Sequence, residues 1–272
     1  LDDTVTTYLP AFAANGKGAV NIRHTLTHTA GLKHLVAESG NNTWHRFVEA
    51  ICESELNPGW EPGRKAGYSV GVGWIILAEI VRLVDGRPYE RYAREDILLF
   101  LGMNDSWISS SPERFEAYGE RICRLANTEG EEPEPVPWDV ADGDLYWPGG
   151  SDRGPMRELG RFYEMLPGHG EIDGVRILSP QTVEAVTGRH RTGLFDDTFR
   201  QVVDWGLGFL LDSQVYHDRP YSYGGHSSPR TFGHAGLVAT WAFNGLPGGR
   251  KHRDRNHQMN TAIYQDLGLA PA

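Results

Sequence analysis

The sequence predicts an α+β fold, in which a mainly helical region precedes an antiparallel sheet flanked by helices. Apolar residues recur at the three- and four-residue spacing of helices early in the chain. Segments rich in β-branched and aromatic residues come late, and a further helix is expected after them. This order is typical of an α+β arrangement. We therefore expect one domain over residues 1–272, with a mainly helical region over 1–190 and the sheet strands and closing helix over 191–272.

The first helices are expected before residue 100. One short helix covers residues 21–28 and is stopped by a glycine C-cap at Gly31, and a second covers residues 43–54. A third helix ends at Gly86 and Pro88, and its apolar residues recur at helical spacing: Trp74, Leu77, Ile80, Val81 and Val84. A fourth follows over residues 89–100.

The later elements follow from cap and turn chemistry. Ser111-Pro112-Glu113 combines an N-cap, a proline at the first helical position and an acid in the first turn, so a short helix begins there, and Ser179-Pro180 starts another in the same way. Residues 156–166 also indicate a helix. Between the helix that begins at Ser111 and the helix over residues 156–166, residues 128–155 interleave acids with prolines and glycines. This pattern predicts a long acidic surface loop. The expected strands are residues 205–211 and 237–244, and the closing helix is residues 257–267.

Composition excludes several classes of function. The 26 basic and 36 acidic residues give a net charge of -10, which argues against a nucleic-acid or anionic-membrane surface. The most apolar stretch, residues 70–84, contains Glu79 and Arg82 and is too short to span a membrane. Cys52 and Cys123 are interpreted as buried thiols, which slightly favours a cytoplasmic location. We expect no cofactor.

Two local patterns could carry chemistry by themselves. Residues 67–71 read Gly-Tyr-Ser-Val-Gly, which matches the Gly-x-Ser-x-Gly nucleophile elbow and would make Ser69 a nucleophile. The preceding residues are rich in glycine and proline, so they do not predict the buried strand that an elbow requires. His24, His28 and His34 lie close together, but no acidic partner has metal-motif spacing, so we interpret them as structural or surface histidines and expect no metal.

Five motifs, in order, resemble one family. The first two are Leu1-Asp2-Asp3-Thr4-Val5 and the segment 22–32, which reads IRHTLTHTAGL. The others are Tyr68-Ser69-Val70, residues 101–106 (LGMNDS) and Phe232-Gly233-His234-Ala235-Gly236. They resemble the "LDDPV", "IRHLLTHTSGL", Tyr-x-Asn, "PLGMxDS" and Lys-Thr-Gly or His-x-Gly motifs of the penicillin-recognising serine hydrolases, which include class C β-lactamases, DD-peptidases and esterases. The resemblance extends from residue 1 to about residue 269 and implies a β-lactamase/transpeptidase-like fold.

The resemblance implies acyl transfer. In that family the serine of Ser-x-x-Lys attacks a carbonyl carbon, and the lysine and a tyrosine phenol handle its proton. Tyr68 and His234 are the candidate catalytic residues that the motifs supply. Gly236 belongs to the strand that borders the substrate, and the amide of Leu237 would form half of an oxyanion hole.

Three departures qualify this picture. No Ser-x-x-Lys occurs in the 272 residues; in the family it lies upstream of the segment with which this sequence starts, so we expect an N-terminally truncated fold that lacks part of the sheet. Val70 replaces the asparagine of Tyr-x-Asn. The segment after Gly236 is short, so we expect the usual hairpin there to be deleted, which would weaken the oxyanion role of Leu237.

Three functional hypotheses follow. The chain is part of a serine hydrolase acting on an ester or amide, with Ser69 as a possible substitute nucleophile. Alternatively, it is a truncated homologue that uses the old cleft for non-hydrolytic chemistry, such as a cyclisation of an apolar metabolite, or it is a non-catalytic binding protein. We expect a small-molecule ligand as partner, neither nucleic acid nor membrane, and a homo-oligomer that covers the incomplete sheet edge.

Overall fold

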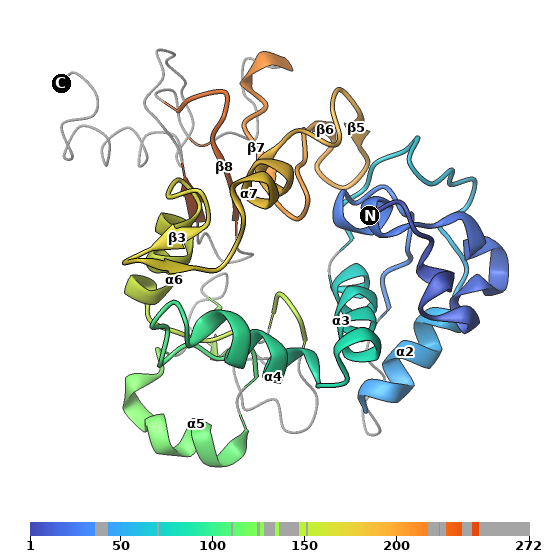
Figure 1. Cartoon of the computed structure of the whole chain (residues 1–272). Helices are drawn as coiled ribbons and strands as arrows, with labels where there is room; N and C mark the ends of the chain where they lie inside the picture. The colour runs from blue at the N-terminus through green and yellow to red at the C-terminus, as the bar shows by residue number, and fades with distance from the viewer. Residues whose placement is uncertain are drawn as a thin grey trace.

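The computed structural model describes most of the chain. The described residues are 1–35, 43–69, 71–109, 111–123, 126–127, 134–135, 147–150, 152–216, 223, 227–235 and 241–244. Helices and short antiparallel strand pairs make up this part of the chain, so the predicted α+β class is confirmed (Figure 1). The predicted closing helix 257–267, together with Val70, Gly236 and Leu237, lies outside the described residues.

The chain begins with short helical turns. These are η1 (Val5–Thr7), η2 (Pro10–Ala19) and α1 (Ile22–Leu26). Asn21 caps α1 by accepting a hydrogen bond from the His24 amide at 2.7 Å. In turn, Nδ1 of the His24 ring accepts a hydrogen bond from the Asn21 amide at 3.4 Å. The predicted end of this helix at Gly31 is wrong, because α1 already stops at Leu26. Two features require glycine at position 31. Its φ is 75°, and the indole of Trp60 occupies the space that a Cβ would need.

The helices α2 (Trp44–Glu53) and α3 (Val72–Asp85) are confirmed close to their predicted bounds. Thr43 caps α2, and Gly86, with a φ of 87°, ends α3. The fourth helix divides into α4 (Tyr89–Ala93) and a π-helical turn, η3 (Arg94–Leu98). The helix α3 contacts α1, α2 and α4, so it connects the N-terminal turns to the rest of the helical region (Figure 1).

Serine caps start two later helices as predicted. Ser111 accepts from the Arg114 amide at the start of α5 (Pro112–Tyr118), which η4 (Gly119–Arg121) extends, and Ser179 accepts from the Thr182 amide at the start of α7 (Pro180–Thr187). Between them lies α6 (Met156–Met165), which is also close to its predicted bounds.

Three short strand pairs lie outside the main sheet. They are β1 (Ala126–Asn127) with β2 (Glu134–Pro135), β3 (Glu171–Ile172) with β4 (Val175–Arg176), and β5 (Phe195–Asp196) with β6 (Gln201–Val202). Residues 134–135 of the predicted acidic loop therefore pair as a strand, whereas residues 147–150 form a turn. A final 3-10 turn, η5 (Gln214–Tyr216), follows the last of these pairs.

Within the described residues, the main sheet has three antiparallel strands in the order β7–β8–β9, and α6 packs against β9. They are β7 (Leu210–Leu211), β8 (Phe232–Ala235) and β9 (Trp241–Asn244). The predicted strand 205–211 is shorter than expected, because Gly208, with a φ of 88°, turns the chain back after Trp205. The expected deletion after Gly236 is also wrong: Ala235 pairs with Trp241 and Phe232 with Asn244, so β8 and β9 are the two arms of a hairpin.

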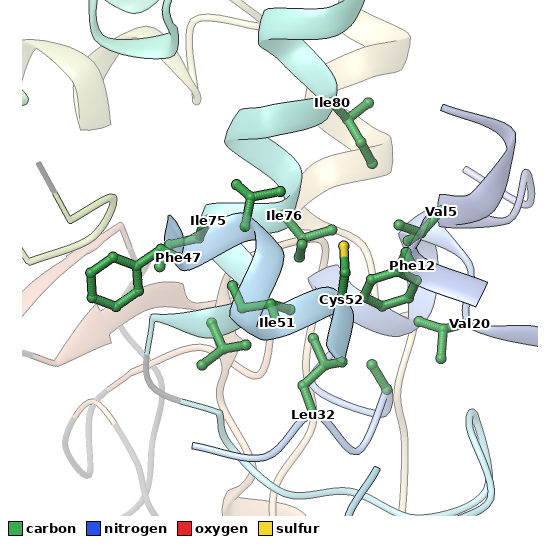
Figure 2. Packing of buried hydrophobic residues seen from close by; sticks show 13 residues of the cluster. Val5, Phe12, Val20, Leu32, Phe47, Ile51, Cys52, Ile75, Ile76 and Ile80 are labelled. Atoms are coloured by element: carbon green, nitrogen blue, oxygen red, sulfur yellow. The ribbon is translucent and has the colours of Figure 1, made fainter. Parts of the chain in front are cut away.

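The largest apolar core joins α2 and α3 to the N-terminal turns. Figure 2 shows Ile51 and Cys52 of α2 beside Ile76 of α3, with Phe12 on the neighbouring segment and Phe47 at the other end of the cluster. Ile51, Ile76 and Phe12 are completely buried. This core holds the N-terminal end of α3, and with it the preceding residues that include Tyr68.

Two further predictions are tested by burial and helix length. Cys52 is a buried free thiol as predicted, but Cys123 is exposed, so the interpretation of both cysteines as buried is wrong for the second. In the described residues, no helix has the combined length and apolar character needed to cross a membrane.

Truncation of one α3 side chain tests the role of this core. Replacing Ile76 with alanine removes buried methyl groups and leaves a cavity, so the free energy of unfolding should fall by about 2–5 kcal/mol. Urea denaturation followed by circular dichroism measures the change. The matched control on the same helix is Val84→Ala, whose side chain is exposed, and it should change stability by less than about 0.5 kcal/mol. Equal losses in both variants would contradict the packing described here.

Candidate active site

The backbone around Tyr68 is held from two sides. The Gly67 amide donates to the carbonyl oxygen of His28 at 3.0 Å, which ties this segment to the turn after α1. The Tyr68 amide donates to the Asp196 carboxylate at 3.3 Å, and its carbonyl oxygen accepts from the Thr198 hydroxyl at 3.1 Å. The segment is therefore fixed between residues distant from it in the sequence.

A buried ion pair supports this clamp. Arg191 and Asp196 lie 3.0 Å apart, and both side chains are almost completely inaccessible. The Arg191 guanidinium also donates to the carbonyl oxygens of Val203 and Thr27. Burial lowers the pKa of Arg191 from its usual value, and Asp196 opposes that shift. Partners on every side compensate both charges, as buried charges require.

The carboxylate of Asp196 also organises the β5–β6 turn. One oxygen accepts from the amides of Thr198 and Phe199, at 2.9 and 3.0 Å, besides the Tyr68 amide. Since a single carboxylate oxygen joins this turn to the segment containing Tyr68, the position of Tyr68 depends on residues more than a hundred positions later in the chain.

Aromatic rings surround the Tyr68 phenol. Its ring lies 5.7 Å from that of His234, stacks on Phe199 at 5.3 Å, and approaches Trp205 at 5.7 Å and His28 at 4.6 Å, measured between ring centroids. Tyr68, His234 and Phe199 are partly exposed, whereas Trp205 and His28 are buried. The structure thus brings the two predicted catalytic residues together at an aromatic surface.

His28 lies beneath this surface. Its side chain is buried and its backbone has a φ of 55°. Its Nδ1 accepts a hydrogen bond from the Ser69 amide at 3.4 Å. Desolvation holds the pKa of His28 well below its ordinary value, and the nearby Arg191 and His234 act in the same direction. The imidazole is consequently neutral near pH 7.

Ser69 does not lie in a nucleophile elbow. Ala66, just before it, pairs with Asp196 through a single bridge rather than as a strand. Ser69 is also absent from the described non-glycine residues that have positive φ, so its backbone lacks the strain expected of an elbow. The residue lies shortly before α3, close to Tyr68 in sequence, and its role as a substitute nucleophile stays a prediction.

The described residues contain no group of three histidine, cysteine or acidic side chains that could hold a metal ion. His24 contributes to the cap of α1, and His28 is buried among aromatic rings, so the two have separate structural surroundings. The oxyanion role of Leu237 and the substrate-strand role of Gly236 fall outside the described residues and stay predictions.

Comparisons with known proteins identify the family and the fold of the chain. The family model described as Beta-lactamase matches residues 1–262. A similar curated protein is the esterase/beta-lactamase LipL of Mycobacterium tuberculosis, which is 26% identical over 86% of this chain and 57% of its own length. The chain thus spans little more than half of that relative.

Solved structures show the same fold. A penicillin-binding protein homologue from Caulobacter crescentus has a TM-score of 0.74 and 24% identity, covering 98% of this chain and 76% of that one. EstCE1, described as a hydrolase with promiscuous acyltransferase activity, has a TM-score of 0.73 and 21% identity, covering 97% and 78%. The predicted β-lactamase/transpeptidase-like fold is confirmed.

The ion pair can be tested by removing one charge. Replacing Asp196 with asparagine preserves shape but leaves the Arg191 charge buried without its partner, so the free energy of unfolding should fall by about 3–5 kcal/mol. Urea denaturation measures this loss. Glu61→Gln removes one charge from the exposed Arg64–Glu61 pair and should cost less than about 1 kcal/mol. A loss at Asp196 no larger than at Glu61 would rule out a structural role for the buried pair.

The buried imidazole predicts a pH dependence. The unfolded chain protonates His28 near its ordinary pKa of 6.5, whereas the folded protein keeps it neutral. Stability is therefore unaffected by this group above about pH 7.5 and falls below about pH 6.5, by up to about 1.4 kcal/mol per pH unit. Urea denaturation between about pH 7.5 and 5.5 should show a steeper loss in the wild type than in His28→Asn. Parallel losses would assign the acid sensitivity to other groups.

Proposed function

The chain belongs to the Beta-lactamase family, and on that premise we propose that Tyr68 and His234 line an acyl-transfer site for a small ester or amide. The contact between their rings, 5.7 Å apart, is the observation that carries the proposal, because two motif residues far apart in sequence meet there. The name of the relative LipL, esterase/beta-lactamase, is compatible with either an ester or an amide.

In this proposal Tyr68 carries the proton of a serine nucleophile. As the nucleophile attacks the substrate carbonyl, its proton passes to the phenolate oxygen of Tyr68, and the same proton later reaches the leaving group. A phenol ordinarily has a pKa of about 10, so its anion needs positive charge nearby. The buried Arg191 lies behind the aromatic cluster, with its guanidinium carbon 5.2 Å from the Trp205 ring centroid, although Asp196 balances its charge.

The candidate nucleophile is a serine next to Tyr68. The 272 residues contain no Ser-x-x-Lys, so Ser69, next to Tyr68, is the candidate that they offer. Its amide is held by His28, and its hydroxyl oxygen lies close to Gly73 of α3. The amide of Leu237 completes the proposal as a donor to the developing oxyanion.

A second candidate function uses the same aromatic surface without an acyl-enzyme. The replacement of the motif asparagine by Val70 favours this candidate. In that case an apolar small molecule would be bound, or converted by a non-hydrolytic step such as cyclisation. A homo-oligomer formed at a sheet edge would be compatible with either function.

Reactive acyl probes test the first candidate directly. The chain is incubated with p-nitrophenyl acetate or a chromogenic cephalosporin, and turnover and intact mass are measured. We expect an acyl adduct that maps to a serine. Tyr68→Phe should slow turnover by on the order of 100- to 10,000-fold, because it removes proton transfer. Tyr8→Phe is the control, since the Tyr8 hydroxyl donates to the exposed Asp3 carboxylate and lies outside the cluster.

The outcomes separate the candidates. An adduct lost in Ser69→Ala would assign the nucleophile to Ser69. The absence of both adduct and turnover in a folded sample would contradict covalent catalysis by this chain. A screen of apolar ligands by tryptophan fluorescence would then test the second candidate, because Trp205 lies in the aromatic cluster.

A further inference from the structure

His28 combines features that are unfavourable for a purely structural residue. Its side chain is buried, and its backbone adopts the left-handed conformation that asparagine or glycine accommodates more easily. Because Nδ1 accepts from the Ser69 amide, the single proton of the neutral ring is on Nε2. That Nε2 atom is buried and has no hydrogen-bond partner among the described residues. A buried donor without a partner calls for a functional explanation.

The ring of His28 forms the inner wall of the aromatic cluster. It lies 4.6 Å from the Tyr68 ring and 4.7 Å from the Trp205 ring, to which it is perpendicular at 89°. The His28 ring also makes an edge contact with Trp74 of α3, with the ring centroids 6.0 Å apart. The ring therefore limits the orientations open to the Tyr68 phenol, because the bond from the Ser69 amide fixes the orientation of the imidazole itself.

The charged and titratable groups near His28 come from several elements. Arg191 lies after α7, His234 in β8 and Tyr68 before α3, while Asp196 of β5 compensates the charge of Arg191. A positive charge on His28 would face Arg191 in a buried environment. The site is accordingly built for a neutral ring at this position.

We propose that His28 is a positioning residue for Tyr68: through its Nδ1 it holds the Ser69 amide, and through its ring it sets the orientation of the Tyr68 phenol. The inference rests on the proposed role of Tyr68 in proton transfer. It assigns to the histidine of the IRHTLTHTAGL segment a function beyond support of the fold. The strained backbone and the unpaired Nε2 proton then follow from placing an imidazole at this position.

His28→Asn separates the two roles. Asparagine tolerates the positive φ, and its side-chain oxygen can replace Nδ1 as the acceptor for the Ser69 amide, so the fold should survive. The ring wall and the Nε2 proton are lost. The matched control is His169→Asn, because His169 has the same φ of 55° but is exposed. Circular dichroism checks the fold of both variants.

The first measurement needs no substrate. Phenolate formation by Tyr68 is followed as the ultraviolet difference between each protein and its Tyr68→Phe counterpart. In His28→Asn the phenol loses its contact with the imidazole ring, so its titration midpoint should differ from that of the wild-type protein. His169→Asn should keep the wild-type midpoint. An unchanged midpoint in His28→Asn, or its failure to fold, would overturn the proposal and assign His28 to the fold alone.

The second measurement is hydrolysis of p-nitrophenyl acetate across a range of pH. His28→Asn should lower kcat by on the order of 10- to 100-fold with little change in KM, because a misplaced proton carrier affects the chemical step. The pH profile should move with the Tyr68 midpoint, and unaltered kcat with an unaltered profile would contradict the proposal. A wild-type chain that hydrolyses no ester would contradict the proposed function, while the titration would still decide whether His28 positions Tyr68.

Discussion

The buried Arg191–Asp196 ion pair is the constraint on which the candidate site depends. Each partner makes further bonds to backbone groups, so the pair joins the turn after α1, the segment of Tyr68 and the β5–β6 turn in a single polar network. Such a pair adds little net stability compared with apolar packing, but it tolerates few alternative arrangements. Its value here is geometric: it defines where the Tyr68 backbone lies relative to the β5–β6 turn.

Much of the fold could be predicted from local patterns. The serine caps at Ser111 and Ser179 and the apolar periodicity of α3 identified helices, because capping and amphipathicity involve neighbouring residues. The prediction failed where a distant contact decides the conformation. The strand expected over 205–211 is broken at Gly208, whose missing side chain makes room for Trp74, and no local pattern reports the position of that indole.

The residues of the candidate site also fall into those that the sequence could identify and those that it could not. Tyr68 and His234 could be selected because motif order, not local chemistry, marks them. Arg191 and Asp196 could not, since a buried charge and a surface charge look identical in a sequence and only the tertiary pairing distinguishes them. His28 was noticed but interpreted as structural. The structure adds its ring contacts with Tyr68 and Trp205, which the sequence gives no means of foreseeing.

The clamp on Tyr68 has a consequence for biosynthesis. Its amide is bonded to a carboxylate 128 residues later in the chain. At the usual speed of a ribosome, about 5–20 residues per second, Asp196 follows Tyr68 after on the order of ten seconds. During that interval α3 and its apolar neighbours can already pack, but the Tyr68 amide still lacks its hydrogen bond to Asp196. Translation that stopped before Asp196 would therefore release a partly folded helical body in which the segment of Tyr68 lacks this bond.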